Sequence, residues 1–323
     1  MNCVLANRRK WFQASPEPAE TTGVWANFNL SKAKYVGSAS LSAFNTSGTT
    51  KTVDCRGISL LPDGRILFSD YATAYCYVWG FADGHPFEVA HFNEKCDSRF
   101  NRSSIAGLQF NGDGTGLYYS RPDEVGLYYH KFTTPYDLST NVGTDYTKLW
   151  SSGGGIAYNM TSLVMSSDGK ILLYRPGYGY SGWGSIYCRK GTEAWPATET
   201  NVYDFELTRF AKVAAFDSKV IETTSTVTEL RWNEMCVSPD GLVMIMTVGA
   251  DSTDTATKKS KYAVKFVMTE AWNPSTMVYH SKLYLGNDLG LSSIPRCCCV
   301  NADGTKMLIF DYKGYKFHEY TLA

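Results

Sequence analysis

The sequence lacks a net charge and a long apolar run, and each absence excludes a class of partner. Lys and Arg together number 31, and so do Asp and Glu, so no long-range field draws the chain to a nucleic-acid backbone or an anionic bilayer. No apolar run is long enough to cross a bilayer as a helix. Arg8, Arg9 and Lys10 follow a very short apolar run, the wrong order for a signal peptide. We therefore expect no nucleic-acid partner, no membrane insertion and synthesis in the cytoplasm.

Motifs that bind metals and cofactors are also scarce. The nine cysteines are odd in number and unevenly spaced, and no CxxC motif occurs, so we expect reduced thiols. In the run Cys297–Cys299, strand alternation would separate Cys298 from its two neighbours, which argues against a tetrahedral metal site. The alternative of a metal or redox site at this run stays open. The five histidines form no HxH or HExxH pair, and we expect no metal and no cofactor.

Three partial matches to known motifs each miss a required residue. Gly169-Lys170-Ile171 lacks the hydroxyl residue of a P-loop, and residues 179–183 lack the last glycine of a nucleophile elbow. The loop that starts at Asn111 has Pro122 where a calcium loop has Glu. We therefore expect no catalytic residues and no enzymatic activity.

What the sequence does contain is a fivefold repeat. Runs of alternating apolar residues flank an Asp-Gly pair, which is typical of a type I′ turn between two antiparallel strands. A third run, rich in aromatic and β-branched residues, follows in each unit. The spacing between turns suits a propeller blade of four strands with its loops. The five pairs are Asp63-Gly64, Asp113-Gly114, Asp168-Gly169, Asp240-Gly241 and Asp303-Gly304.

The last repeat unit has room for only three strands before Ala323, so its fourth strand is expected from the N-terminal segment. Residues 24–31 look like an aromatic connector that follows the third strand of other units, and residues 34–41 would then pair with residues 315–322. The matching connectors are residues 133–140, 193–198 and 270–276.

These patterns predict an all-β fold. We expect a five-bladed β-propeller of four-stranded antiparallel blades, closed by an N-terminal strand that completes the last blade. Residues 24–323 would form this single domain, and residues 1–23 an N-terminal arm. The connector aromatics are expected to be structural staples; they are Trp25, Tyr136, Trp195 and Trp272.

Three short motifs point to a known family. They are Asp303-Gly304-Thr305-Lys306-Met307, Tyr320-Thr321-Leu322 and residues 134–140. The repeat that carries them resembles β-propeller repeats of marine tailed bacteriophage proteins, over roughly residues 24–323. The resemblance implies a non-enzymatic virion structural protein, either a tail-associated adsorption protein or a surface decoration. It implies that the protein resides in the virion and binds other virion proteins or a host surface glycan or receptor.

Loops between the second and third strands of each blade would share the face opposite the Asp-Gly turns, where variation on a constant scaffold carries recognition. Aromatic rings and charges on these loops suit stacking and hydrogen bonding to a ligand. Salt bridges between neighbouring blades are the alternative interpretation of the charges. The candidate binding residues are Tyr71, Arg121, Tyr178, Tyr180, Trp183 and Tyr312, and the candidate channel-mouth charges are Asp70, Arg175 and Asp311.

Two other functions stay open at this stage. A lectin-like carbohydrate-binding propeller would use the same aromatic loops, with repeated weak pockets that add up to avidity. A channel-centred glycoside hydrolase or lyase would use Asp70 and Asp311 as acid and base, with Glu124 in a nearby loop.

Overall fold

A computed structural model describes most of the repeat region. The described residues are 25–40, 54–71, 75–81, 92–101, 105–121, 126–141, 147–151, 160–176, 185–191, 206–212, 216–220, 232–249, 261–290 and 293–323. They form five four-stranded antiparallel sheets and a few short helical turns, so the fold is all-β.

Each sheet is numbered by its place along the chain. Sheet 1 consists of β2 (Cys55–Leu60), β3 (Ile66–Asp70), β4 (Tyr75–Phe81) and β5 (Phe92–Asn101). Sheet 2 consists of β6 (Leu108–Phe110), β7 (Gly116–Arg121), β8 (Gly126–Lys131) and β9 (Thr147–Ser151). Sheet 3 consists of β10 (Met160–Met165), β11 (Ile171–Pro176), β12 (Ser185–Lys190) and β13 (Glu206–Lys212).

Sheets 4 and 5 complete the set. Sheet 4 consists of β14 (Trp232–Val237), β15 (Val243–Val248), β16 (Tyr262–Met268) and β17 (Met277–Tyr284). Sheet 5 consists of β18 (Pro295–Val300), β19 (Lys306–Asp311), β20 (Lys316–Thr321) and, as its outermost strand, β1 (Lys34–Ser40). Two short helices, α1 (Asp217–Val220) and α2 (Gly286–Leu289), lie in connections.

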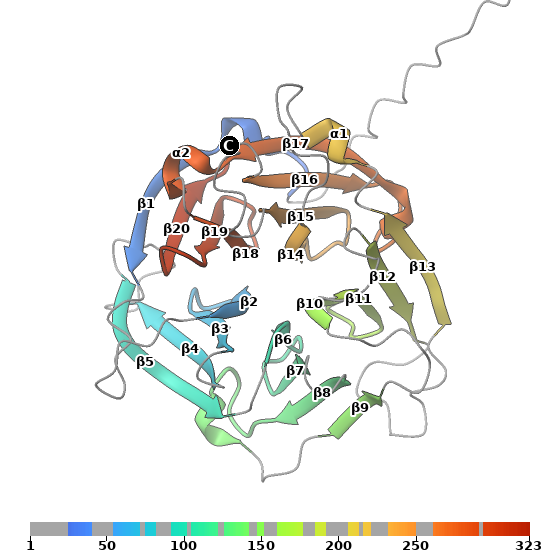
Figure 1. Cartoon of the computed structure of the whole chain (residues 1–323). Helices are drawn as coiled ribbons and strands as arrows, with labels where there is room; N and C mark the ends of the chain where they lie inside the picture. The colour runs from blue at the N-terminus through green and yellow to red at the C-terminus, as the bar shows by residue number, and fades with distance from the viewer. Residues whose placement is uncertain are drawn as a thin grey trace, which may run out of the picture.

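The five sheets follow one another around a common centre, with the first strand of each sheet innermost (Figure 1). The inner strands β2, β6, β10, β14 and β18 contact one another in this order, and β18 also contacts β2. The apolar core is divided accordingly into five clusters, one between each pair of neighbouring sheets. Apolar side chains are therefore buried mainly between neighbouring sheets.

The Asp-Gly turns have the predicted position but not the predicted type. A type I′ turn needs positive φ at both central residues, yet these five aspartates, all within the described part of the chain, are not among its positive-φ residues. Only the glycines are left-handed, for example Gly241 with φ 74°. The Gly241 amide donates to the Ser238 carbonyl three residues earlier (2.8 Å), as in a type I turn followed by a left-handed glycine. The type I′ prediction is therefore wrong, because the aspartates do not adopt a positive φ. The Asp side chain stabilises the observed turn by accepting a hydrogen bond from a later amide.

The N-terminal segment completes sheet 5 as predicted. β1 runs antiparallel to β20, with Lys34 opposite Thr321 and Ser40 opposite Lys316. β1 thus covers the edge that β20 would otherwise present to solvent.

The segment before β1 has the conformation of the aromatic connectors, which confirms the likeness read from the sequence. Each connector contains a one-turn 3-10 helix whose capping Asn or Asp side chain accepts from the amide two residues later. The three turns are η1 (Leu30–Lys32), η4 (Leu138–Thr140) and η7 (Pro274–Thr276). The connector around Trp195 lies outside the described residues.

The connector aromatics fasten the Asp-Gly turns, in agreement with their expected role as staples. The Trp272 amide donates to the Gly241 carbonyl (2.8 Å), and the Tyr136 amide donates to the Gly114 carbonyl (2.9 Å). A Cβ added to Gly241 would lie 2.1 Å from the Trp272 ring. Trp25 binds the turn of sheet 5 instead, since its Nε1 donates to the carbonyl of Asn301 (3.1 Å).

Candidate functional site

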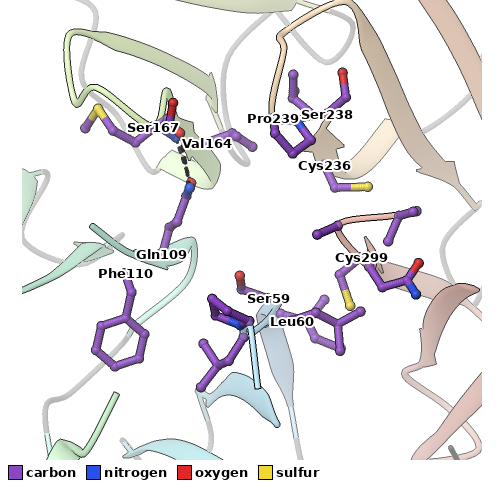
Figure 2. Close-up of a pocket in the computed structure, with 18 of the residues that line it drawn as sticks. Ser59, Leu60, Gln109, Phe110, Val164, Ser167, Cys236, Ser238, Pro239 and Cys299 are labelled. Carbon is purple, nitrogen blue, oxygen red and sulfur yellow. Dashed lines mark hydrogen bonds between the residues drawn. The ribbon is translucent and has the colours of Figure 1, made fainter. Parts of the chain in front are cut away.

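A cavity of about 700 Å³ lies at the centre of the face that carries the Asp-Gly turns, called the turn face below. Its wall is formed by the turn-face ends of all five inner strands. Ser59, Gln109, Cys236 and Cys299 surround the cavity in Figure 2. A central cavity reached from one face is a common place for a ligand in such an architecture.

The amide of Gln109 holds two sheets together at this wall. Its Nε2 donates to the Met165 carbonyl (3.1 Å), and the Met165 amide donates to its Oε1 (2.7 Å), which Figure 2 marks with a dashed line. The Gln109 amide thus hydrogen-bonds to the edge of β10 that no described strand pairs with, in the way that a neighbouring strand would. Both hydrogen-bonding groups of the Gln109 side chain therefore connect sheet 2 to sheet 3.

Glu234 on β14 is the buried acid of the cavity wall. The polar side chains of Ser162 and Cys297 and the charges of Arg175 and Arg296 favour the ionised form of its carboxyl group. Burial outweighs these favourable partners and raises the pKa of Glu234 to about 8. The group is therefore mostly protonated at neutral pH and can donate a hydrogen bond.

Arg175 belongs to a chain of contacts that crosses three sheets. Its guanidinium, on sheet 3, donates to the Asn233 carbonyl on sheet 4, and the Asn233 side chain donates to the Pro295 carbonyl on sheet 5 (2.8 Å). Burial lowers the pKa of Arg175 to about 10. Arg175 is thus buried between sheets, where the charge of Glu234 also acts on it, in line with the inter-blade alternative for this charge.

The opposite side of the molecule, called the loop face, carries Tyr71 and Tyr312. There Asp54 forms ion pairs with both Arg56 (2.8 Å) and Arg296 (2.8 Å). The Arg56 guanidinium lies 3.5 Å from the centre of the Tyr71 ring, and that of Arg296 lies 4.5 Å from the centre of the Tyr312 ring. These five residues are the loop-face cluster. They join sheet 1 to sheet 5 and bring the two predicted tyrosines into one group.

The predicted charged residues Asp70, Asp311 and Arg121 lie outside the loop-face cluster. Asp70 is buried and accepts from the Asp54 amide (2.9 Å). Asp311 is buried and accepts from the Ser293 hydroxyl (2.7 Å) and from three backbone amides. Arg121 is buried with its guanidinium 5.6 Å from the centre of the Tyr128 ring. Asp70 and Asp311 thus fix the backbone at their strand ends.

Several sequence-predicted residues are not tested by the structure. Tyr178, Tyr180, Trp183 and Glu124 lie outside the described residues, so their part in binding stays a prediction. Sequence reasoning in turn missed Glu234, Asp54, Arg56 and Arg296. The available signal was a charged residue within or beside an apolar inner strand, which predicts a buried partner or a functional group.

The described part of the chain offers neither a metal-binding cluster nor a membrane-spanning helix. No three His, Cys, Asp or Glu side chains there lie close enough together to hold a metal ion. No helix there is long and apolar enough to cross a bilayer.

No protein-family model matches the chain, and no curated protein matches it. Among solved structures, glutaminyl cyclase from Myxococcus xanthus is similar, with a TM-score of 0.52, 12% identity and coverage of 90% of this chain and 96% of that one. The Cps50 β-propeller domain of Myceliophteria thermophila reaches 0.42 at 10% identity, covering 83% of each chain. Periplasmic gluconolactonase from Pseudomonas aeruginosa reaches 0.43 at 10% identity, covering 82% of this chain and 65% of that one.

The similarity to glutaminyl cyclase supports a β-propeller fold and, at 12% identity, carries nothing further. None of the three proteins comes from a bacteriophage, and two are enzymes by name. The virion role therefore remains a prediction, and the likeness neither supports nor opposes catalysis.

Proposed function

We propose that the chain is a closed five-bladed β-propeller that works as a rigid, non-enzymatic binding disc. The closed ring is supported by the pairing of β1 with β20 and by the contact of β18 with β2. It is also supported by the apolar cluster between sheets 1 and 5. A sheet packed on both sides deforms little, so the disc presents a preorganised surface.

One observation carries the binding role, namely the loop-face cluster. Two guanidinium groups share the Asp54 carboxylate, so the cluster keeps one excess positive charge, and Lys313 beside Tyr312 adds another. Each arginine also holds a tyrosine ring in place before any ligand arrives. Flat rings beside fixed positive charge suit an acidic glycan, whose sugar rings stack and whose carboxylate pairs with arginine.

A glycan array with neutral and acidic members tests this role. We expect binding to acidic glycans that falls about tenfold or more in Tyr71→Ala with Tyr312→Ala, since stacking and cation–π contacts are lost together. Tyr35→Ala is the matched control, because Tyr35 is an exposed ring on the outer strand β1. Binding without preference for acidic glycans, or equal loss in the control, would contradict the proposal.

The resemblance to marine phage propellers leads us to propose further that the disc is carried on a virion, on the tail or the capsid surface. Mass spectrometry of purified virions tests this placement. We expect the chain among the tail or capsid proteins. Its recovery only from the unassembled fraction of infected cells would rule the virion role out.

Catalysis at the cavity is a second candidate, favoured by the buried acid Glu234 at the wall of a central cavity. Glu234 would then act as the general acid in place of Asp70 and Asp311, whose carboxylates bind backbone amides. Turnover of glycan or glutaminyl substrates that is lost in Glu234→Gln and kept in Glu270→Gln would support it. A broad screen without turnover would eliminate it.

A further inference from the structure

The inner strand of sheet 5 has a thiol contact on each of its two sides. Cys297 faces sheet 1, where its Sγ lies 3.9 Å from that of Cys55. Cys298, the next residue, faces sheet 4, where its Sγ lies 3.8 Å from that of Cys236. Strand alternation sends the two side chains to opposite sides. β18 is thus flanked by two inter-sheet thiol pairs, and all four thiols are free.

The two thiol pairs differ in their access to solvent. Cys55 and Cys297 are both fully buried, in the cluster between sheets 1 and 5. Cys236 is only partly buried and lies at the wall of the turn-face cavity (Figure 2). Its partner Cys298 is fully buried behind it. A small dissolved oxidant that enters the cavity therefore meets Cys236 first.

We propose that Cys236 and Cys298 form a peroxide-oxidisable pair whose disulfide links sheet 4 to sheet 5. The hydrogen bond to Cys236 and burial hold the pKa of Cys298 above its usual range, which leaves Cys236 to react first. The cavity supplies the route for hydrogen peroxide, a molecule little larger than water.

The chemistry takes place in two balanced steps. The Cys236 sulfur, having lost its proton, attacks one oxygen of hydrogen peroxide; the O–O bond breaks and the departing hydroxide takes up a proton to become water. The sulfenic acid formed on Cys236 is then attacked by the Cys298 sulfur. The S–S bond forms, the S–O bond breaks, and the hydroxyl group leaves as water with the proton of Cys298. Two thiols and one peroxide thus give one disulfide and two waters.

Disulfide formation requires a small movement of the Cys236 and Cys298 sulfur atoms. A disulfide has an S–S distance of about 2.05 Å, so the two sulfur atoms, now 3.8 Å apart, approach each other by side-chain rotation. The bond would join β14 to β18, the inner strand of the sheet that β1 completes. Oxidation would therefore tighten the ring at its closing sheet.

Mild peroxide treatment of the full chain, followed by alkylation and peptide mass spectrometry, tests the proposal. We expect a peptide pair that links Cys236 with Cys298 and is lighter by about 2 Da than the two reduced peptides. Dithiothreitol should reverse the link. The urea midpoint should rise on oxidation and return on reduction, since a crosslink restricts the unfolded chain.

Two variants separate this pair from its neighbour. Cys236→Ser should abolish the link and the midpoint shift, and Cys236→Ala serves if the serine variant folds poorly. Cys55→Ser should leave both unchanged, because Cys55 belongs to the inaccessible pair. A link that persists in the Cys236 variants, or wild-type protein that yields only unlinked or overoxidised Cys236, would overturn the proposal. Neither result depends on glycan binding.

Discussion

Buried ionisable residues shape the chemistry of this protein at the scale of single residues. Glu234 on sheet 4 and Arg175 on sheet 3 are both buried, and the charge of each acts on the other. Their attraction offsets only part of the cost of removing two charges from water. The pKa of Glu234 is therefore raised and that of Arg175 is lowered. The carboxyl group gains its charge as pH rises above neutral, which makes folding sensitive to pH.

Glu234→Gln should change how stability depends on pH. The folded pKa of about 8 lies above the ordinary value of 4.5, so between these values the folded state binds more protons. This group's stabilisation is complete below pH 4.5 and is lost as pH rises through 8. We expect the free energy of unfolding of the wild type to fall between pH 5.5 and pH 8.5, by about 1.4 kcal/mol per pH unit until the pH reaches the folded pKa. The variant, measured by urea denaturation, should lack this fall.

Glu270→Gln is the control for that pH profile, because Glu270 is exposed. Its profile should follow that of the wild type. Parallel profiles for Glu234→Gln and the wild type would show that Glu234 ionises normally.

Lys265 is another buried ionisable residue, and it holds the N-terminal connector. Its Nζ donates to the carbonyls of Trp25 (2.9 Å), Ala26 (3.0 Å) and Phe28 (2.6 Å), which holds the N-terminal connector on sheet 4. Lys265→Met should lower the free energy of unfolding by roughly 3 kcal/mol, since three acceptors, two of them buried, lose their donor.

Lys282→Met is the matched control for Lys265, because Lys282 donates to a single carbonyl, that of Val220 (2.7 Å). Urea denaturation should show a loss below about 1 kcal/mol for this variant. Hydrogen exchange of residues 25–30 should speed up only in Lys265→Met. Equal losses of stability in the two variants would contradict the proposed role of Lys265 in holding the N-terminal connector.

At the scale of elements, the repeating unit is a hairpin turn covered by an aromatic connector from the same sheet. Asp240-Gly241 and Trp272 show the arrangement, in which the amide of the aromatic residue donates to the carbonyl of the turn glycine. The N-terminal segment supplies this cover to sheet 5 through Trp25. The turns are thus joined to the connectors both by backbone hydrogen bonds and by ring contact.

A double-mutant cycle on Gly241 and Trp272 measures that contact. Gly241→Ala should destabilise the wild type by roughly 3 kcal/mol, from the left-handed φ and from the ring that the new methyl group meets. In the Trp272→Ala background the same change should cost only about 1 kcal/mol, because the ring is gone. Thermal and urea unfolding provide the free energies. Additive losses would mean that the Trp272 ring does not restrict the size of the side chain at position 241.

At the scale of the whole molecule, the two ends of the described chain share one sheet. β1 lies outside β20, and the Asn29 amide donates to the carbonyl of the last residue, Ala323 (3.1 Å). Sheet 5 packs against sheet 4 on one side and sheet 1 on the other. The stability of sheet 5 therefore depends on a contact between the two ends of the described chain.

Removal of residues 1–41 should expose the edge of β20 and uncover the last Asp-Gly turn. We expect self-association and a lower, less cooperative urea transition, measured by light scattering and circular dichroism. Removal of residues 1–23 is the control, because it leaves every described element in place. A shortened chain without β1 that stays monomeric and equally stable would contradict closure by this strand.

Much of this fold could be predicted from the sequence, because its signals are local. Asp-Gly pairs between alternating apolar runs predicted the hairpins, and the likeness of residues 24–31 to later connectors predicted the N-terminal strand. The turn type was wrong, since an Asp-Gly pair also fits a type I turn with a left-handed glycine. Of the candidate site, Tyr71 and Tyr312 were anticipated, but their arginine partners were not.

The sequence by itself determined the repeat, the strand order within each unit and the segment that completes the last sheet, because turn residues and side-chain alternation act over a few residues. Only the tertiary structure decided which charges and thiols meet. Asp54 pairs with Arg296 and Cys236 contacts Cys298 because the packing of the sheets brings neighbouring inner strands together. No local pattern encodes such contacts, since the distance between two inner strands depends on how all the sheets pack.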